Sequence, residues 1–298
     1  MTTAAIPTPR PTWAALFLEL TKFKISAAST FTASMGYIAF HRGVDAGLVT
    51  TLLGTLLLAL AASALNEVQE RHLDALMERT RNRPLPRGLI SPLGATVLAS
   101  LLALTGFLLL KAFHGWIPTL LGLLALGWYN GFYTPLKRRS AFAVVPGSVI
   151  GALPPAIGWT AAGGSLGDPA MAALCFVFFV WQVPHFWLLS LLHAEGYEQA
   201  GFPTLTRHFD RTQILRLTFT WTCGTVAAGA LLPLFHALRG LPALLLLGAA
   251  SLWLLARFIR LLRPSPEAST IRRAFLDINL YALALMAAVI WGAFGTAG

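Results

Sequence analysis

The chain has 298 residues, of which 56% are apolar and only 11% are charged. Soluble domains carry roughly one quarter charged residues, so this composition excludes an ordinary soluble protein and predicts lipid as the solvent. The formal net charge of +10 would also fit nucleic-acid binding. However, the basic residues lie in loops between apolar runs and no nucleic-acid-binding motif is present, so we expect membrane lipid as a partner and no nucleic acid.

The first 24 residues precede any apolar run of membrane-spanning length. Trp13 to Leu20 is expected to form a short amphipathic helix at the membrane interface, with Lys22 and Lys24 at the level of the lipid headgroups. We therefore predict a cytoplasmic N-terminal segment with an interfacial helix at residues 1–24, followed by a single transmembrane domain at residues 25–298.

Apolar runs of about 20 residues recur along the rest of the chain, and this length spans a hydrocarbon core of about 30 Å. The predicted fold class is therefore all-α: a polytopic membrane protein with about nine transmembrane helices. The expected spans, bounded by charged residues or by Pro and Gly, are residues 25–40, 46–66, 92–113, 116–133, 141–162, 169–193, 214–236, 240–262 and 274–296.

The Lys and Arg residues predict the orientation of these spans. Nine alternating spans leave only Arg42, Lys111 and Arg239, of 22 basic residues, on one side of the membrane. Cytoplasmic loops carry the excess of positive charge, so the opposite side, which bears the N-terminus, is predicted to be cytoplasmic. An even number of spans would break this segregation.

Four acidic residues lie between Glu67 and Glu78, directly after the second span. Asn66, Glu70 and Asp74 are spaced four apart, so they share one face if the helix continues through them. Hard oxygen ligands in this arrangement suit Mg²⁺, which commonly bridges protein carboxylates to substrate phosphates. The arginines that follow, which can hold phosphate oxygens in bidentate fashion, are Arg79, Arg81 and Arg83.

A simpler interpretation of the same segment remains open. A solvated cytoplasmic loop would also contain Glu and Arg residues that pair at helical spacing, and its arginines would obey the positive-inside rule. The polar face from Asn66 to Asp74 argues for a site, because its composition is not one that anchors a helix in lipid.

Two later groups of residues are candidates for the same site. Tyr133 and Lys137 are four apart near a cytoplasmic helix end, so a phenol and an ammonium are expected to face one region. Arg138 follows them. His185 lies well within an apolar span, where a histidine is costly unless it has a partner, so it is either a hydrogen-bonded core residue or a substrate contact.

These segments together resemble a known family. Residues 66–74 are similar to the first aspartate-rich motif of the UbiA prenyltransferase superfamily, Asn-x-x-x-Asp-x-x-x-Asp, with Glu70 in the middle acidic position. The continuation MERTRNRPLP, at residues 77–86, resembles the heme O synthase (protoheme IX farnesyltransferase) branch. So do residues 133–164 and WQVPHF at residues 181–186.

The resemblance implies a function. A farnesyl group would pass from farnesyl diphosphate to a vinyl group of heme b, producing heme O and diphosphate, with Mg²⁺ as the cofactor. In this family the Tyr133 and Lys137 pair is associated with the prenyl diphosphate. The site residues so expected are Asn66, Glu70, Asp74, Tyr133 and Lys137 as catalytic, and Arg79, Arg83, Arg138, His185 and Tyr197 as substrate-binding.

The second metal motif of the superfamily is degenerate in this chain. The sequence LLHAEGYEQAGFPTL follows the sixth span and contains Glu195 and Glu198, but no Asp-x-x-x-Asp. Gly196 occupies a position where the family pattern has an acid, so Glu195 would substitute from one residue away. Glu195 and Glu198 are therefore expected to complete the metal ligands, with Asn66, Glu70 and Asp74.

Three alternative functions are compatible with parts of this sequence. A UbiA-type enzyme could act on a quinone precursor or a chlorin instead of heme. A small-solute transporter would place ionisable residues near mid-bilayer, whereas these carboxylates lie at one interface. A structural or assembly protein is the third alternative. We expect a bacterial cell inner membrane location, with heme A synthase or a terminal oxidase as recipients of the product.

Overall fold

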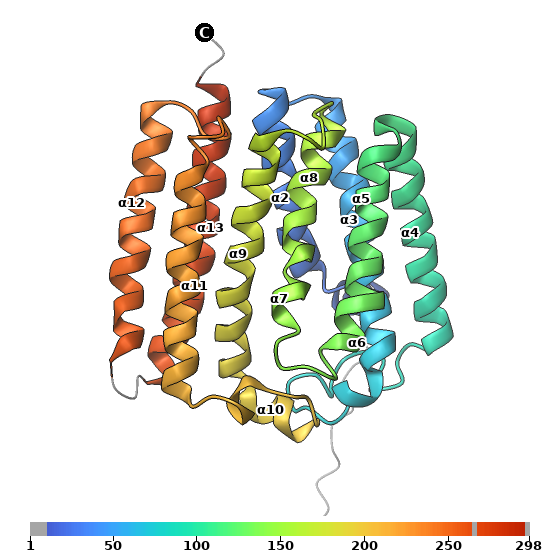
Figure 1. Ribbon diagram of the computed structural model, residues 1–298. Coiled ribbons are helices and arrows are strands. Elements are labelled where there is room, and N and C mark those ends of the chain that lie inside the picture. The colour runs from blue at the N-terminus through green and yellow to red at the C-terminus, as the bar shows by residue number, and fades with distance from the viewer. Residues whose placement is uncertain (1–10, 264–266, 296–298) are drawn as a thin grey trace, which may run out of the picture.

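The computed structural model describes residues 11–263 and 267–295, and these form a bundle of helices (Figure 1). Residues 1–10 of the predicted N-terminal segment lie outside the described residues, as does residue 296 of the last predicted span. The elements in chain order are α1 (Trp13–Leu20), α2 (Phe23–His41), α3 (Ala46–Asp74), α4 (Pro92–His114), α5 (Trp116–Gly127), the π-helix η1 (Trp128–Tyr133), α6 (Thr134–Leu136), α7 (Val144–Gly147), α8 (Val149–Ala161), α9 (Pro169–Leu192), α10 (Ala194–Gln199), the 3₁₀ helix η2 (Leu205–Arg207), α11 (Arg211–Leu231), α12 (Leu241–Phe258), the 3₁₀ helix η3 (Ile259–Leu262) and α13 (Ala268–Phe294).

The helices confirm a multi-pass membrane protein of all-α class. Within the described residues, seven helical stretches are long and apolar enough to cross a membrane. They coincide with predicted spans two, three and five to nine. The predicted spans at 25–40 and 116–133 fall on α2, which is rich in Ser and Thr, and on α5, which ends after 12 residues where η1 begins. The count of nine therefore stays a prediction.

Side-chain caps mark the first residues of several of these helices. Asp45 accepts a hydrogen bond from the backbone N–H of Leu48 and caps α3. Ser91 caps α4, with Pro92 in the first turn, where its missing N–H costs nothing. Asp210 and Gln213 form a reciprocal capping box at the start of α11. Local sequence therefore explains where these three helices begin.

The two ends of the bundle differ in character. Figure 1 shows α6, α10 and the loop after α3 at one end, which we call the carboxylate end because Asp74 lies there. The connections from α8 to α9 and from α11 to α12 lie at the other end, which we call the opposite end. Arg42 and Arg239 belong to connections at the opposite end, in agreement with the predicted segregation of charge.

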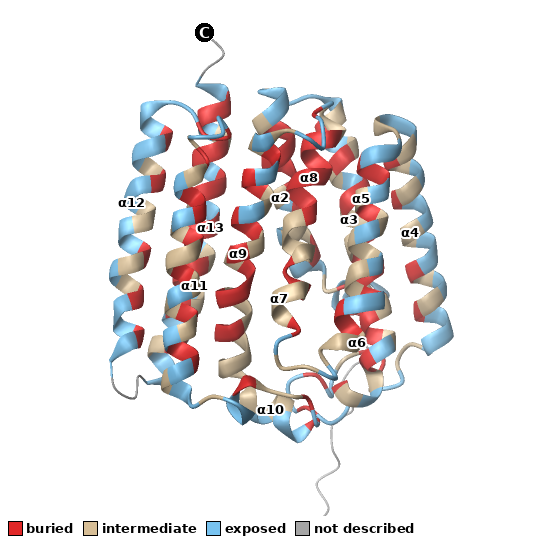
Figure 2. Cartoon of the chain, in the orientation of Figure 1, coloured by how far each residue is buried: buried red, intermediate tan, exposed pale blue. Residues whose placement is uncertain are grey.

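Small residues allow two pairs of helices to pack closely. A Cβ added to Gly106 of α4 would lie 2.8 Å from the carbonyl oxygen of Gly54 on α3. Similarly, Gly36 of α2 has no room for a Cβ beside the backbone of Pro155 on α8. Figure 2 shows that buried residues line the inner faces, whereas the outer faces of α4 and α12 are exposed. Large apolar residues such as Leu104 and Leu252 cover these outer faces, as expected for contact with lipid.

The segregation of charge predicts that the carboxylate end faces the cytoplasm, and thiol labelling can test this orientation. In a variant whose partly buried Cys175 and Cys223 are replaced by Ser, Leu76→Cys places a thiol at the carboxylate end and Leu166→Cys places one at the opposite end. The side chains of Leu76 and Leu166 are 60% and 50% exposed. A membrane-impermeant maleimide applied to intact cells should label Leu166→Cys only, and both thiols after permeabilisation. Labelling of Leu76→Cys in intact cells would invert the orientation.

Candidate functional site

The last two turns of α3 carry the candidate site. This helix has 29 residues and continues without interruption to Asp74, so Asn66, Glu70 and Asp74 share one face as predicted. All three are buried, with exposed fractions of 1%, 4% and 1%. Buried carboxylates are costly unless charge or hydrogen bonds compensate them, so the surroundings of these residues must supply partners.

A cationic side chain from another segment meets each of these three residues. Because the cations come from three distant parts of the chain, the site exists only when the bundle is assembled. The hydrogen bonds are Lys22 Nζ to Asn66 Oδ1 at 2.5 Å, Lys137 Nζ to Glu70 Oε2 at 2.6 Å, and Arg83 Nη1 to Asp74 Oδ2 at 2.7 Å.

Lys22 is the functional candidate that sequence reasoning missed. It was expected at headgroup level with Lys24, but only Lys24 is exposed. Lys22 forms the turn between α1 and α2 with φ 47° and ψ 47°, a left-handed conformation that is unusual for a residue other than glycine. Burial, together with the positive charges of Arg83 and Lys137, lowers the pKa of Lys22 to about 7. No spacing pattern in the sequence links Lys22 to Asn66, so nothing local indicates this contact.

Tyr133 and Lys137 meet at the site, as their spacing predicted. The Lys137 ammonium lies 5.7 Å from the centroid of the Tyr133 ring and 5.8 Å from that of Phe202. Tyr129 stacks on Tyr133 with ring centroids 5.9 Å apart. Tyr133 ends the π-helix η1, a type of distortion that is frequent at functional sites. Asn66 is tied to the residue after this π-helix, because its Nδ2 donates to Thr134 Oγ1 at 3.1 Å.

The predicted arginines divide between the site and the surface. Arg83 reaches Asp74, whereas Arg79 is exposed and lies near His193, whose pKa is lowered by burial and then by the charge of Arg79. Arg138 is also exposed, and its Nη2 donates to the backbone carbonyl of Gln69 at 2.6 Å. Of the three arginines expected to bind substrate, only Arg83 therefore pairs with a carboxylate of the α3 motif.

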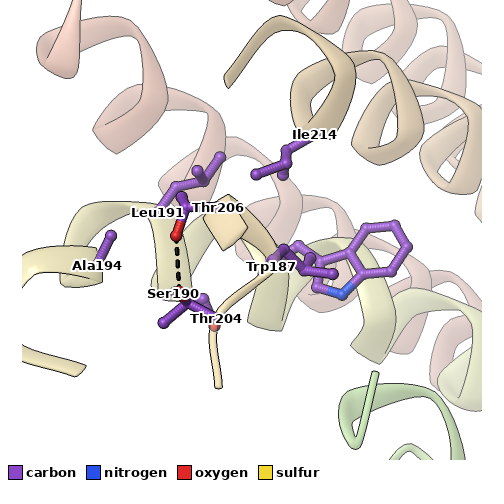
Figure 3. A pocket seen from close by; sticks show the side chains of 8 residues that line it. Trp187, Ser190, Leu191, Ala194, Thr204, Thr206 and Ile214 are labelled. Atoms are coloured by element: carbon purple, nitrogen blue, oxygen red, sulfur yellow. Dashed lines mark hydrogen bonds between the residues drawn. The ribbon is translucent and has the colours of Figure 1, made fainter. Parts of the chain in front are cut away.

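Helix α10 covers the end of α3 through apolar contacts. Phe202 is 5% exposed and packs with Met77 and Ala200, and the Tyr197 ring meets that of Phe202 edge-on with centroids 5.7 Å apart. Tyr197 thus lies in the layer that closes the site. Figure 3 shows the small crevice between α9, α10 and the start of α11, where Leu191 and neighbouring apolar side chains join α10 to the bundle.

The two glutamates of α10 are not drawn into the cluster on α3. Glu195 and Glu198 are both exposed. Glu198 accepts hydrogen bonds from Thr206 and Thr204 of its own loop, which hold its pKa below the usual value. In the part of the chain that the structure describes, no group of three or more His, Cys, Asp or Glu side chains is placed to hold a metal ion.

The donor set on α3 nevertheless fits a hard cation. Glu70 Oε1 is buried and has no hydrogen-bond partner, while Oε2 of the same carboxylate pairs with Lys137. An unpartnered buried carboxylate oxygen beside an amide oxygen and a second carboxylate is chemistry that suits Mg²⁺.

A row of aromatic rings leads from the site into the bundle. Tyr133 lies 6.3 Å from Phe186, and Phe186 meets His185 edge-on at 5.4 Å between centroids. The His185 ring also packs against Trp181 and Phe275, at 4.8 Å and 5.0 Å. Its Nδ1 atom is buried without a hydrogen-bond partner. The site therefore combines charged groups at its mouth with an aromatic, apolar interior.

Comparisons with known proteins found one matching family and solved structures of similar fold. A model of the UbiA prenyltransferase family matches residues 27–282. The protoheme IX farnesyltransferase of Geobacter sulfurreducens is 45% identical over 218 residues, which cover 73% of this chain and 80% of that protein. A digeranylgeranylglyceryl phosphate synthase structure has a similar fold, with a TM-score of 0.76 at 16% identity, covering 94% of this chain and 98% of the other. A UbiA homologue from Archaeoglobus fulgidus bound to GPP and Mg²⁺ gives a TM-score of 0.68 at 14% identity, covering 92% and 99%.

The pair formed by Lys137 and Glu70 makes a stability prediction. Lys137→Met leaves the buried Glu70 carboxylate without its nearest cation, and breaking a buried ion pair from one side costs roughly 3–5 kcal/mol. The variant should unfold at a clearly lower temperature in detergent. Glu70→Gln added to Lys137→Met removes the stranded charge and should recover most of the loss. A wild-type melting temperature for Lys137→Met would mean that the pair contributes little to the fold.

Proposed function

This chain belongs to the UbiA prenyltransferase family, and from that premise we propose that it transfers the farnesyl group of farnesyl diphosphate to a vinyl group of heme b, producing heme O and diphosphate. The observation that carries the proposal is the buried set of Asn66, Glu70 and Asp74, each met by a cation, at the mouth of an aromatic interior. The choice of heme as acceptor is supported by the identity to a protoheme IX farnesyltransferase.

The cations of the site would hold the diphosphate. Lys22, Lys137 and Arg83 converge on α3 and can donate to diphosphate oxygens once these replace the side-chain oxygens of Asn66, Glu70 and Asp74 as acceptors. Mg²⁺, held by Asn66, Glu70 and Asp74, would neutralise charge on the departing diphosphate. The unpartnered Glu70 Oε1 supports this ligand set. The binding of GPP and Mg²⁺ by the homologue from Archaeoglobus fulgidus supports a similar dependence here.

The aromatic residues would shape the reaction that follows. The allylic C–O bond breaks, its electron pair leaves with the diphosphate, and cationic character develops on the farnesyl carbon. The ring faces of Tyr133 and Tyr129 can stabilise that cation and exclude water from it. The heme vinyl group then forms the new C–C bond. Water adds to the resulting cation and loses a proton, which leaves the hydroxyethylfarnesyl substituent.

Two further roles belong to the proposal. We assign His185 to contact with heme b, because it lies among aromatic rings with a free buried nitrogen. Glu195 is the candidate ligand for a second metal, because Glu198 is already held by Thr204 and Thr206. Arg79, Arg138 and Tyr197 surround the mouth of the site, where they would guide the anionic substrate.

The cellular setting follows from the same proposal. The carboxylate end would face the cytoplasm of a bacterial inner membrane, where soluble diphosphate can leave the site after the reaction. Heme O would stay in the membrane and pass to heme A synthase or to a terminal oxidase.

Membranes that contain this protein should convert heme b and farnesyl diphosphate into a heme whose mass has increased by one farnesyl group and one hydroxyl group. The measurement is mass analysis of the extracted hemes, with release of diphosphate measured in parallel. Parallel reactions should supply a quinone precursor or a chlorin as the acceptor. Prenylation of one of these, with heme left unchanged, would reassign the acceptor.

The carboxylates of α3 should be essential for turnover. Asp74→Asn and Glu70→Gln each remove an anionic oxygen ligand, so the rate should fall by at least about a hundredfold, equivalent to about 2.7 kcal/mol. Glu78→Gln is the matched control, because Glu78 is exposed in the same segment and should be dispensable. Retained activity at saturating Mg²⁺ in either site variant would remove that residue from the site.

Lys22 should be needed to bind the diphosphate. Lys22→Met removes a hydrogen bond to a charged group, which typically contributes about 1.5–3 kcal/mol, so the KM for farnesyl diphosphate should rise roughly 10- to 100-fold. Lys24→Met, two residues away and exposed, should behave like the wild-type protein. Equal KM values for the two variants would leave Lys22 without a role in substrate binding.

A further inference from the structure

The opposite end of the bundle contains a cleft that is separate from the site on α3. The cleft has a volume of about 440 Å³ and lies where the end of α2, the start of α9 and the connection between α11 and α12 meet. These connections lie at the end of the bundle where α13 ends (Figure 1). Arg42 and Arg239 both line it. Two of the three basic residues predicted to lie on this side of the membrane therefore share one cleft.

The charges of the cleft are unbalanced. Within the described ranges, neither Arg42 nor Arg239 forms an ion pair, and Arg239 Nε donates only to the backbone carbonyl of His236, at 3.1 Å. Asp168 is the single carboxylate among the lining residues. It already accepts hydrogen bonds from Trp159 Nε1 and from the backbone N–H of Ser165, both at 2.8 Å. Two guanidinium groups against one satisfied carboxylate leave the cleft positive.

The rest of the lining is largely apolar and exposed. Phe40, Leu234 and Phe235 have exposed fractions of 38%, 71% and 43%, so they present apolar surface that an acyl chain could cover. The Phe40 ring meets Trp159 edge-on with centroids 5.2 Å apart and forms the inner wall. An amphiphile can therefore place a charged group between the arginines and keep its apolar part against these side chains.

The backbone holds two of the basic residues in a conformation that costs energy. Arg42 and His236 have φ values of 57° and 58° and are, with Lys22, the only residues other than glycine with positive φ in the described chain. Such conformations cost of order 1–3 kcal/mol and persist where the surrounding structure requires them. Both lie in the lining of this one cleft.

We propose that this cleft binds the phosphate group of an anionic phospholipid, with Arg42 and Arg239 donating to the phosphate oxygens and the acyl chains lying along Leu234 and Phe235. Guanidinium groups suit phosphate because their planar donors can bind two oxygens together. The site lies at the far end of the bundle from Asp74, so the proposal does not depend on the proposed transferase activity.

The test uses the full-length protein purified in an uncharged detergent. Its melting temperature and its bound lipids, counted by native mass spectrometry, are followed while phosphatidylglycerol, phosphatidylcholine or inorganic phosphate is added. Phosphatidylglycerol should bind and raise the melting temperature in a saturable manner, because a ligand that binds only the folded state stabilises it. Phosphatidylcholine, which has no net charge, and inorganic phosphate, which has no apolar part, should have much weaker effects.

Paired variants locate the effect. The double variant Arg42→Gln/Arg239→Gln should bind phosphatidylglycerol about 25-fold more weakly, about fivefold for each arginine near a lipid surface. Lys111→Gln is the matched control: Lys111 is the third basic residue of this face, and it lies over the Trp116 ring at 4.3 Å, outside the cleft. This variant should bind as the wild-type protein does. Arg42→Lys/Arg239→Lys keeps the charges but loses the planar donors, so it should bind phosphatidylglycerol more tightly than the double glutamine variant and more weakly than the wild-type protein. This graded response separates loss of binding from loss of folding.

Three results would overturn the proposal. Equal affinity of the wild-type protein and the double glutamine variant would exclude the cleft as the binding site. An equal loss in Lys111→Gln would mean that lipid responds only to the overall charge of this face. Inorganic phosphate that stabilises as well as phosphatidylglycerol would assign the site to free phosphate and not to lipid.

Discussion

The burial of oxygen-bearing side chains at the end of α3 is the constraint on which the rest of this molecule depends. Glu70 and Asp74 are almost inaccessible, and removing charged groups from water costs several kcal/mol per ion unless partners are supplied. Arg83, from the loop after α3, pairs with Asp74, and Lys137, from the segment after η1, pairs with Glu70. Lys22, from the turn between α1 and α2, donates to the neighbouring Asn66. The geometry of one helix end therefore determines where three other segments must lie.

Buried ion pairs of this kind contribute little net stability, because desolvation offsets much of the Coulomb attraction. Their role here is to fix the positions of the segments that carry the cations. The same cations that compensate the carboxylates are of the type that binds diphosphate, and the carboxylates are of the type that binds Mg²⁺. The charges of the site are thus paired with one another within the protein. Glu70 is the exception in part, because one of its oxygens pairs with Lys137 and the other has no hydrogen-bond partner.

The surrounding helices protect this arrangement from two directions. Helix α3, which bears the site residues, packs closely against α4 through Gly54 and Gly106. Phe202, which follows α10, packs against Met77 at the carboxylate end of the bundle. The aromatic row from Tyr133 to His185 extends inward from the charged mouth. At the other end of the bundle, Arg42 and Arg239 line a separate cleft.

Properties that depend on neighbours along the chain can be predicted from the sequence. Apolar runs predict the membrane helices, the four-residue spacing predicts that Asn66, Glu70 and Asp74 share a face, and the loop charges predict which ends of the bundle are basic, because each follows from helical period and length. The cations that reach the site are known only from the packing of the helices. Lys22 lies 44 residues from Asn66 and Lys137 lies 67 from Glu70. Lys22 and Lys24 are chemically identical and two residues apart. Lys22 points inward because it forms the left-handed turn between α1 and α2, whereas Lys24 is exposed. Glu198 likewise bonds to its own loop because Thr204 and Thr206 fold back onto it. Contacts between distant segments depend on how helices pack, and no local pattern encodes that information.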